Sequence, residues 1–209
     1  RDERVAAFQT AVAGLDVSFA ALDVTDFDAC GALVARLEAE HGAVDILVNA
    51  AGITRDARLV KMDKRQWDDV LSVNLDGVFN LCRHVVDGMA ARGHGRIVNI
   101  SSINGQTGQF GQTNYAAAKA GMHGFTMSLA REVARKGVTV NSISPGYIDT
   151  EMTRAIRDDV REQIVAGIPA GRMGQPEDIA RAVAFLTADA SDYVTGVNLP
   201  VNGGLFMSF

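Results

Sequence analysis

Short apolar runs alternate with stretches of helical periodicity along the chain, and this alternation limits the possible folds more than any other feature of the sequence. Runs at 44–48, 96–101, 138–143 and 197–201 have the length of strands and are apolar almost throughout, as in strands covered on both faces. The segments between them carry apolar residues at helical spacing. The alternation predicts an α/β protein with a doubly wound parallel sheet in a three-layer arrangement.

The remaining pattern completes this outline. Helices are expected at 2–13, 75–92 and 115–136. Thr25 and Asp28 are typical of a capping-box start for one helix, and Pro176 opens the last helix at its first-turn position. Alternating apolar residues at 17–22 predict a further short strand. The 209 residues contain no repeat and no linker, so a single domain over 1–209 is expected.

Composition excludes several classes of function. The chain has 20 Lys and Arg against 25 Asp and Glu, a net charge of −5, which argues against a dedicated nucleic-acid binder. No apolar run approaches about 18 residues, so no membrane span is predicted. Cys30 and Cys82 are too few for a disulfide framework or a metal-binding cluster. We interpret both as small buried hydrophobic residues, which fits a reducing compartment such as the cytoplasm.

Polar and glycine-rich clusters follow several of the predicted strands. They are Asp23, residues 49–52, residues 101–111 and residues 145–150. Ligands of parallel α/β sheets bind beyond the carboxyl ends of the strands. The position of these clusters therefore predicts a ligand site at that edge.

Tyr115 and Lys119 stand four residues apart at the start of a predicted helix and therefore share one face. A Lys cation one turn away favours the phenolate and is expected to lower the pKa of Tyr115 from about 10, which makes acid–base work feasible near neutral pH. Ser102, at the end of a buried strand, would bring a hydroxyl beside them. Taken alone, the pair is more often a core-edge tyrosine beside a solvated lysine, because Tyr-x-x-x-Lys is common by chance.

Other candidates leave two interpretations open. Asn74 lies within a predicted helix, where its amide is structural or holds a water molecule. Asn49 bridges adjacent strand ends or belongs to a simple turn. Asp23 caps the next helix or accepts hydrogen bonds from a ligand, and Thr150 could donate to an amide or a phosphate.

Taken together, these residues resemble the short-chain dehydrogenase/reductase family. The matching elements are Asn-Ala-Ala-Gly at 49–52, Asn74, Ser102, Tyr115-x-x-x-Lys119 and Pro145-Gly146. The resemblance covers nearly the whole chain and implies a Rossmann-like sheet and hydride transfer between NAD(P)(H) and an alcohol or carbonyl. It implies catalytic roles for Asn74, Ser102, Tyr115 and Lys119. It implies cofactor binding by Asp23, Val24, Asn49, Ala50, Gly52, Tyr115, Lys119, Pro145, Gly146, Ile148 and Thr150.

The loop at 105–115, the segment 53–56 and the ending 202–205 are similar to those of bacterial acetoacetyl-CoA reductases. This similarity implies NADPH, rather than NADH, as the cofactor and acetoacetyl-CoA as the substrate, with (R)-3-hydroxybutyryl-CoA as a product used for polyhydroxybutyrate. It implies that the substrate is bordered by Ser102, Gln109, Phe110, Gln112 and Tyr147. Phe110 would be an apolar wall, and the loop has no Arg or Lys for a free carboxylate.

Three alternatives remain open: a 3-oxoacyl-acyl-carrier-protein reductase, a 3-hydroxybutyrate dehydrogenase, and an inactive fragment that only associates with subunits. The helices at 75–92 and 115–136 carry apolar residues on more than one face, and family members commonly tetramerise through them, so a homotetramer is expected. Residues 151–174 resemble the family's mobile lid over the substrate.

The sequence departs from the family in one respect. No G-x-x-x-G-x-G run, the usual pyrophosphate loop, follows any predicted strand. By resemblance, a strand, that loop, its helix and a second strand are missing, so we expect the natural protein to continue N-terminally. That part also holds the usual NAD-versus-NADP determinant.

Overall fold

The computed structural model describes residues 2–154 and 156–207. Its helices, including short 3-10 and π turns labelled η, are α1 (Asp2–Ala11), α2 (Phe27–His41), η1 (Leu59–Lys61), α3 (Lys64–Leu71), η2 (Ser72–Asp76), α4 (Gly77–Arg92), α5 (Asn104–Thr107), α6 (Thr113–Val133), η3 (Ala134–Lys136), α7 (Glu151–Arg154), α8 (Asp158–Gly167), α9 (Pro176–Thr187) and η4 (Asp189–Ser191). Its strands are β1 (Ile46–Asn49), β2 (Gly95–Ile100), β3 (Val138–Pro145) and β4 (Asn198–Val201).

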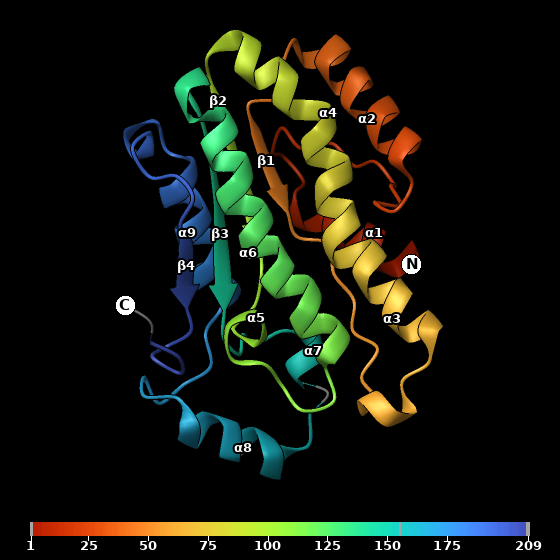
Figure 1. Ribbon diagram of the computed structural model, residues 1–209, viewed down its shortest axis with the longest axis vertical. Helices are drawn as coiled ribbons and strands as arrows, with labels where there is room; N and C mark the ends of the chain where they lie inside the picture. Colours follow the sequence, from red (N-terminus) through yellow and green to blue (C-terminus); the bar gives the residue numbers. More distant parts are fainter. Residues whose placement is uncertain (1, 155, 208–209) are drawn as a thin grey trace.

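The four strands form one parallel sheet in the order β1-β2-β3-β4. The strands pair in a register that sets Asn49 opposite Asn99, and Asn99 opposite Ser142. The carboxyl ends of all four strands therefore lie at the same edge of the sheet (Figure 1). This confirms the parallel α/β sheet that the apolar runs predict.

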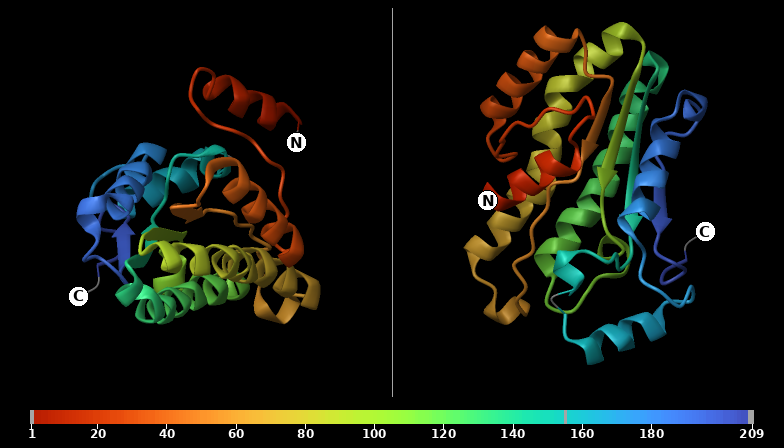
Figure 2. Two further views of the ribbon diagram at one scale, coloured as in Figure 1. Left: turned by 90° about the horizontal axis from the view of Figure 1, so that it is seen from above. Right: turned by 180° about the vertical axis from the view of Figure 1, so that it is seen from behind.

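Helices cover both faces of this sheet, which confirms the three-layer arrangement. One core cluster joins β2 and β3 to α2, α4 and α6 and includes Ile97, Val140 and Met122, all fully buried. A second cluster packs α9 through Leu186 against Val98 and Ile143 on the opposite face. Figure 2 shows the two helical layers on either side of the strands and α1 lying away from them.

The strand expected at 17–22 is wrong. Residues 17–23 form no strand, and the side chains of Val17 and Phe19 are each 48% exposed. Phe19 instead contacts Phe8 of α1, with ring centroids 6.1 Å apart. An alternating pattern becomes a strand only where a neighbouring strand offers its backbone edge. Within the described residues, β1 is the edge strand and pairs with β2 alone, so the segment at 17–22 does not pair with it.

Helix starts were predicted with mixed success. The cap of α2 is Asp26, whose carboxylate accepts a hydrogen bond from the backbone N–H of Ala29 at 2.9 Å, and not Thr25. The Thr25 hydroxyl donates to Asp23 instead, at 2.8 Å. Pro176 does open α9. The helix expected at 75–92 begins with the π turn η2 and continues as α4. None of the helices in the described residues is long and apolar enough to cross a membrane.

Candidate active site

Asn74 sits in the π turn η2 and is fully buried. Its amide nitrogen donates to the carbonyls of Val70 at 2.8 Å and Ile53 at 2.9 Å, and its oxygen accepts from the Ile53 N–H at 3.1 Å. The side chain thereby fixes the segment that follows β1. Gly52 must be a glycine here, because a Cβ would lie 2.7 Å from the Asn74 oxygen. Single π turns within helices are frequent at functional sites.

Asn49 bridges the ends of adjacent strands, which is one of the two interpretations that the sequence left open. Its amide nitrogen donates to the side chain of Asn99 at 2.8 Å, and Asn99 donates to the Thr126 hydroxyl at 2.9 Å. This chain of buried amides ties β1 to β2 and β2 to α6. It holds the carboxyl ends of the strands in place under the site.

Ser102, Tyr115 and Lys119 meet at one cavity of about 340 Å³. Ser102 follows β2, whereas Tyr115 and Lys119 lie one turn apart on α6. The Lys119 Nζ is 5.6 Å from the centre of the Tyr115 ring. Ala50, Gly52, Pro145, Gly146 and Thr150 complete much of the wall. The structure thus brings together the three side chains that the motif spacing singled out.

Gly105 allows α5 to press against α6 at this point. A Cβ on Gly105 would lie 2.8 Å from the backbone carbon of Lys119 and 3.0 Å from the backbone nitrogen of Ala120. The loop after Ser102 is therefore seated directly on the helix that carries Tyr115.

Lys119 is only 4% exposed, and its ammonium donates to the carbonyl of Ile100 at 2.7 Å. Burial disfavours the charged form and lowers the pKa of Lys119 to about 8. An ammonium group has three protons, and Ile100 is the single acceptor found for it within the described residues. Two protons remain to bind a ligand in the cavity.

The pKa of Tyr115 is raised above its ordinary value, mainly by burial. The neighbouring Ser102 hydroxyl acts in the opposite direction, and the negative charge of Asp56 raises the pKa further. The expectation that Lys119 makes the phenol more acidic is therefore wrong for this structure. The reason is that desolvation of the phenolate outweighs the favourable contacts around the ring.

A second cavity of about 380 Å³ adjoins the first and shares Ser102, Tyr115 and Thr150 with it. One wall is a chain of hydrogen bonds in which the Asn104 amide donates to Gln112, and Gln112 donates to Asp56, both at 2.9 Å. This wall is continuous with Ser102, because the Asn104 N–H donates to the Ser102 hydroxyl at 3.1 Å.

The remaining predicted site residues divide into two groups. Gln112, Tyr147, Ile148 and Thr150 line the second cavity as expected of a substrate or cofactor site. The predicted site residues that line neither of these two cavities are Asp23, Val24, Gln109 and Phe110, together with the buried Asn49 and Asn74 described above. Phe110 is 82% exposed, so it does not form the expected apolar wall. Val24 instead binds α4, where its carbonyl accepts from Asn80 at 2.8 Å.

Sequence reasoning missed Asn104 and Asn114. Asn114 is fully buried, donates to the carbonyls of Arg55 and Gln66, and accepts from the backbone N–H of Tyr115 at 2.8 Å. It therefore anchors the start of α6 to the segment that carries Asp56. The available signal was an asparagine at the start of a helix directly before the candidate tyrosine.

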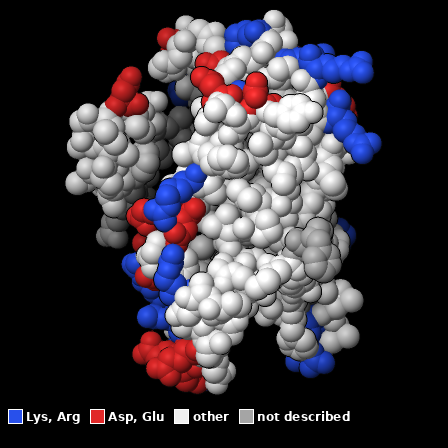
Figure 3. All heavy atoms as spheres, turned by 90° about the vertical axis from the view of Figure 1, so that its left-hand side faces the viewer, with Lys and Arg blue, Asp and Glu red and all other residues white. Residues whose placement is uncertain are grey.

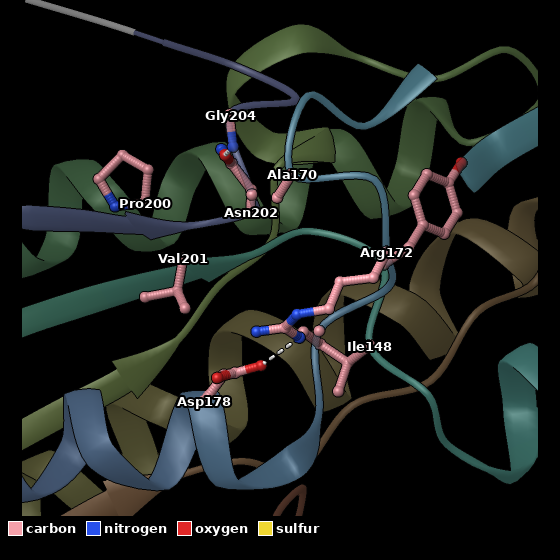
Figure 4. A pocket seen from close by; sticks show the side chains of 11 residues that line it. Ile148, Ala170, Arg172, Asp178, Pro200, Val201, Asn202 and Gly204 are labelled. Atoms are coloured by element: carbon pink, nitrogen blue, oxygen red, sulfur yellow. Dashed lines mark hydrogen bonds and ion pairs between the residues drawn. The ribbon is translucent and has the colours of Figure 1, made fainter. Parts of the chain in front are cut away.

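A third cavity of about 310 Å³ is lined in part by Tyr147 and Ile148, which also line the second cavity. Figure 4 shows the Arg172 guanidinium reaching the Asp178 carboxylate at the start of α9, a contact of 2.9 Å. Arg172 and the backbone N–H of Gln175 both hold the pKa of Asp178 well below its usual range. Because the Gly174 N–H also donates to the Tyr147 carbonyl at 2.9 Å, this corner fixes the segment that borders the second cavity.

The first cavity fits the nicotinamide end of a dinucleotide. Bare backbone at Gly52 borders it, where a Cβ would also come within 3.7 Å of the Lys119 Nζ. The unused ammonium protons match ribose hydroxyls in number and chemistry. A parallel α/β sheet with Ser, Tyr and Lys at its carboxyl edge is the arrangement that the family resemblance implies for a nicotinamide-dependent oxidoreductase.

Comparison with known proteins agrees with an assignment to the reductases. The family model described as "Enoyl-(Acyl carrier protein) reductase" matches residues 1–206. The chain is 59% identical over 197 residues to an acetoacetyl-CoA reductase of Allochromatium vinosum, covering 94% of this chain and 80% of the relative. A Cupriavidus necator protein of the same name is 54% identical over 194 residues, 93% of this chain and 79% of the relative. The Escherichia coli 3-oxoacyl-[acyl-carrier-protein] reductase FabG is 52% identical over 186 residues, 89% of this chain and 76% of the relative.

The chain belongs to the short-chain dehydrogenase/reductase family. It is accordingly an NAD(P)-dependent oxidoreductase that acts on a hydroxyl or keto group.

Proposed function

We propose that the protein reduces acetoacetyl-CoA to (R)-3-hydroxybutyryl-CoA with NADPH, in the cytoplasm and for polyhydroxybutyrate synthesis. The observation that carries the proposal is the convergence of Ser102, Tyr115 and Lys119 on one cavity that adjoins an acyl site with no Lys or Arg among its described lining residues. Two relatives that share more than half of their aligned residues with this chain are named acetoacetyl-CoA reductases. The buried, free thiols of Cys30 and Cys82 fit a reducing compartment.

In the proposed mechanism, the hydroxyls of Ser102 and Tyr115 bind the C3 carbonyl oxygen of the substrate. The bound nicotinamide supplies the hydride that C3 receives. Tyr115 gives its phenolic proton to the carbonyl oxygen, and the raised pKa keeps that proton in place at neutral pH until the oxygen becomes basic. The Ser102 hydroxyl then stabilises the phenolate until it takes a proton from solvent.

Asn74 and Lys119 have supporting roles in this mechanism. Both donors of the Asn74 amide are already used, so only its oxygen can accept from a proton-relay water near Lys119. Lys119 would hold the nicotinamide ribose through its two remaining protons. Cofactor contacts by Asn49, Ala50, Gly52, Pro145, Gly146, Ile148 and Thr150 complete the proposal; Asp23 and Val24 are proposed for the adenosine end.

A thioester is favoured over a free acid as the substrate. Within the described part of the chain, no Lys or Arg lines the second cavity. A site for a free carboxylate would be expected to offer such a cation. This argues against a 3-hydroxybutyrate dehydrogenase. A carrier-protein thioester remains a second candidate because FabG is 52% identical to this chain.

We further propose a homotetramer. An apolar groove between α4 and α6 contains Phe79 and Phe125, and Phe79 and Met127 are each about half exposed. A tetramer with two-fold axes needs a second interface. The side of the molecule that carries β4 and α9 offers a broad area with few charged side chains (Figure 3).

The proposal is tested by measuring NADPH-dependent reduction of acetoacetyl-CoA, a 3-oxoacyl-carrier-protein and free acetoacetate under one set of conditions. The highest kcat/KM is expected for acetoacetyl-CoA. A preference for the carrier-protein thioester would move the assignment to the second candidate. Titration with NADPH, followed by nicotinamide fluorescence, separates an active enzyme from a chain that only associates with subunits, since the latter would leave the fluorescence unchanged.

A further inference from the structure

We infer that Asp56 makes the acyl site selective against a free carboxylate, so that the enzyme rejects free 3-oxo acids and accepts their thioesters, whose acyl end is neutral. The inference rests on the proposed function and adds a specific residue to it. Asp56 carries the single ionisable carboxylate among the described residues that line the second cavity, and that cavity has no cationic lining residue. Within the second cavity, the charge of the lining side chains that a substrate meets is therefore negative.

The position of Asp56 is fixed by the neighbouring amides. Gln112 donates to its carboxylate at 2.9 Å and is itself held by Asn104 at 2.9 Å. This hydrogen bond needs only an acceptor oxygen, which an asparagine side chain also provides. The nearby cation Arg55 does not neutralise Asp56, since it contacts Asp69 at 3.6 Å and the carbonyl of Thr54. Positioning Gln112 therefore does not by itself require the negative charge of Asp56.

The charge reaches the reacting groups. Asp56 raises the pKa of Tyr115, so its field acts on the phenol at the shared edge of the two cavities. A carboxylate substrate held there would meet the same repulsion. Because the side chain is exposed, the effect is screened, and we expect about fivefold in kcat/KM for each unit of charge.

The experiment compares two probes of one acyl skeleton, the anion acetoacetate and its neutral N-acetylcysteamine thioester, in wild type, Asp56→Asn and Asp56→Lys. The ratio of kcat/KM for thioester over acid is expected to fall about fivefold in the first variant and further in the second. The effect is expected to shrink near 1 M salt, where the Debye length is about 3 Å. Asp87→Asn, an exposed carboxylate on α4, is the matched control and should leave the ratio unchanged.

An unchanged ratio in both Asp56 variants, or a change that salt does not reduce, would overturn the inference. A second readout needs no turnover: ultraviolet titration of the phenol, with Tyr115→Phe as the blank, should give a lower Tyr115 pKa in Asp56→Asn than in wild type. If wild type reduces neither probe, the proposed function fails, and the titration still decides whether Asp56 imposes its charge on the site.

Discussion

Replacing Lys119 with methionine measures how much the buried ammonium lowers the free energy of unfolding. The pKa of Lys119 falls from 10.5 to about 8 because of burial. One pKa unit corresponds to 1.36 kcal/mol, so the shift destabilises the folded state by about 3 kcal/mol at neutral pH. Methionine is an unbranched side chain one heavy atom shorter than lysine, and it removes the charge. It also leaves the Ile100 carbonyl without its donor, but that loss does not depend on pH.

The sign of the effect follows from proton binding. Between about pH 8 and 10.5 the unfolded chain holds the Lys119 proton and the folded chain has lost it, so the stability of wild type rises with pH over this range. Relative to Lys119→Met, the free energy of unfolding of wild type should increase by about 2.5 kcal/mol from pH 7 to pH 10.

Urea unfolding of both proteins at several pH values provides the measurement. Lys136→Met, at an exposed position, corrects for the general effect of losing one positive charge. A difference between wild type and Lys119→Met that stays constant across this range would refute the argument that burial depresses this pKa.

Two further substitutions test how the site is held. Gly105→Ala should destabilise the protein by about 1–3 kcal/mol and lower kcat, because the new Cβ would meet the α6 backbone at 2.8 Å. Gly124→Ala, which has open space around it, is the control and should be neutral or stabilising. Equal thermal unfolding of the two variants would contradict this prediction. Ser102→Ala should raise the pKa of Tyr115 and shift the pH profile of kcat to higher pH, since the hydroxyl lowers that pKa; an unmoved profile would show that Ser102 does not act on the phenol.

Much of the fold can be read from the sequence because the strands are covered on both faces. Val98, Val140 and Ile143 are fully buried, as expected of the short apolar runs in which they occur. The segment at 17–22 has an equally clear alternation but forms no strand, since pairing depends on a neighbour that local pattern cannot reveal.

Some features of the candidate site could also be predicted from the sequence, whereas others depend on the folded chain. Tyr115 and Lys119 share a helix, so their juxtaposition follows from spacing alone. The direction of the Tyr115 pKa could not be predicted, because it depends on burial by residues from several elements. Asn104 and Asn114 were missed because their partners are Gln112, Arg55 and Gln66, whose proximity only the folded chain determines.

The most direct test of the account is the rate of acetoacetyl-CoA reduction by Tyr115→Phe, with folding checked by urea unfolding. Phenylalanine keeps the ring against Lys119 and removes only the acidic hydroxyl. Loss of a general acid typically costs about 10²–10⁴-fold, and we expect kcat to fall by at least about 10²-fold while NADPH binding persists. A folded variant that retains the wild-type rate would contradict the assignment of Tyr115 as the proton donor.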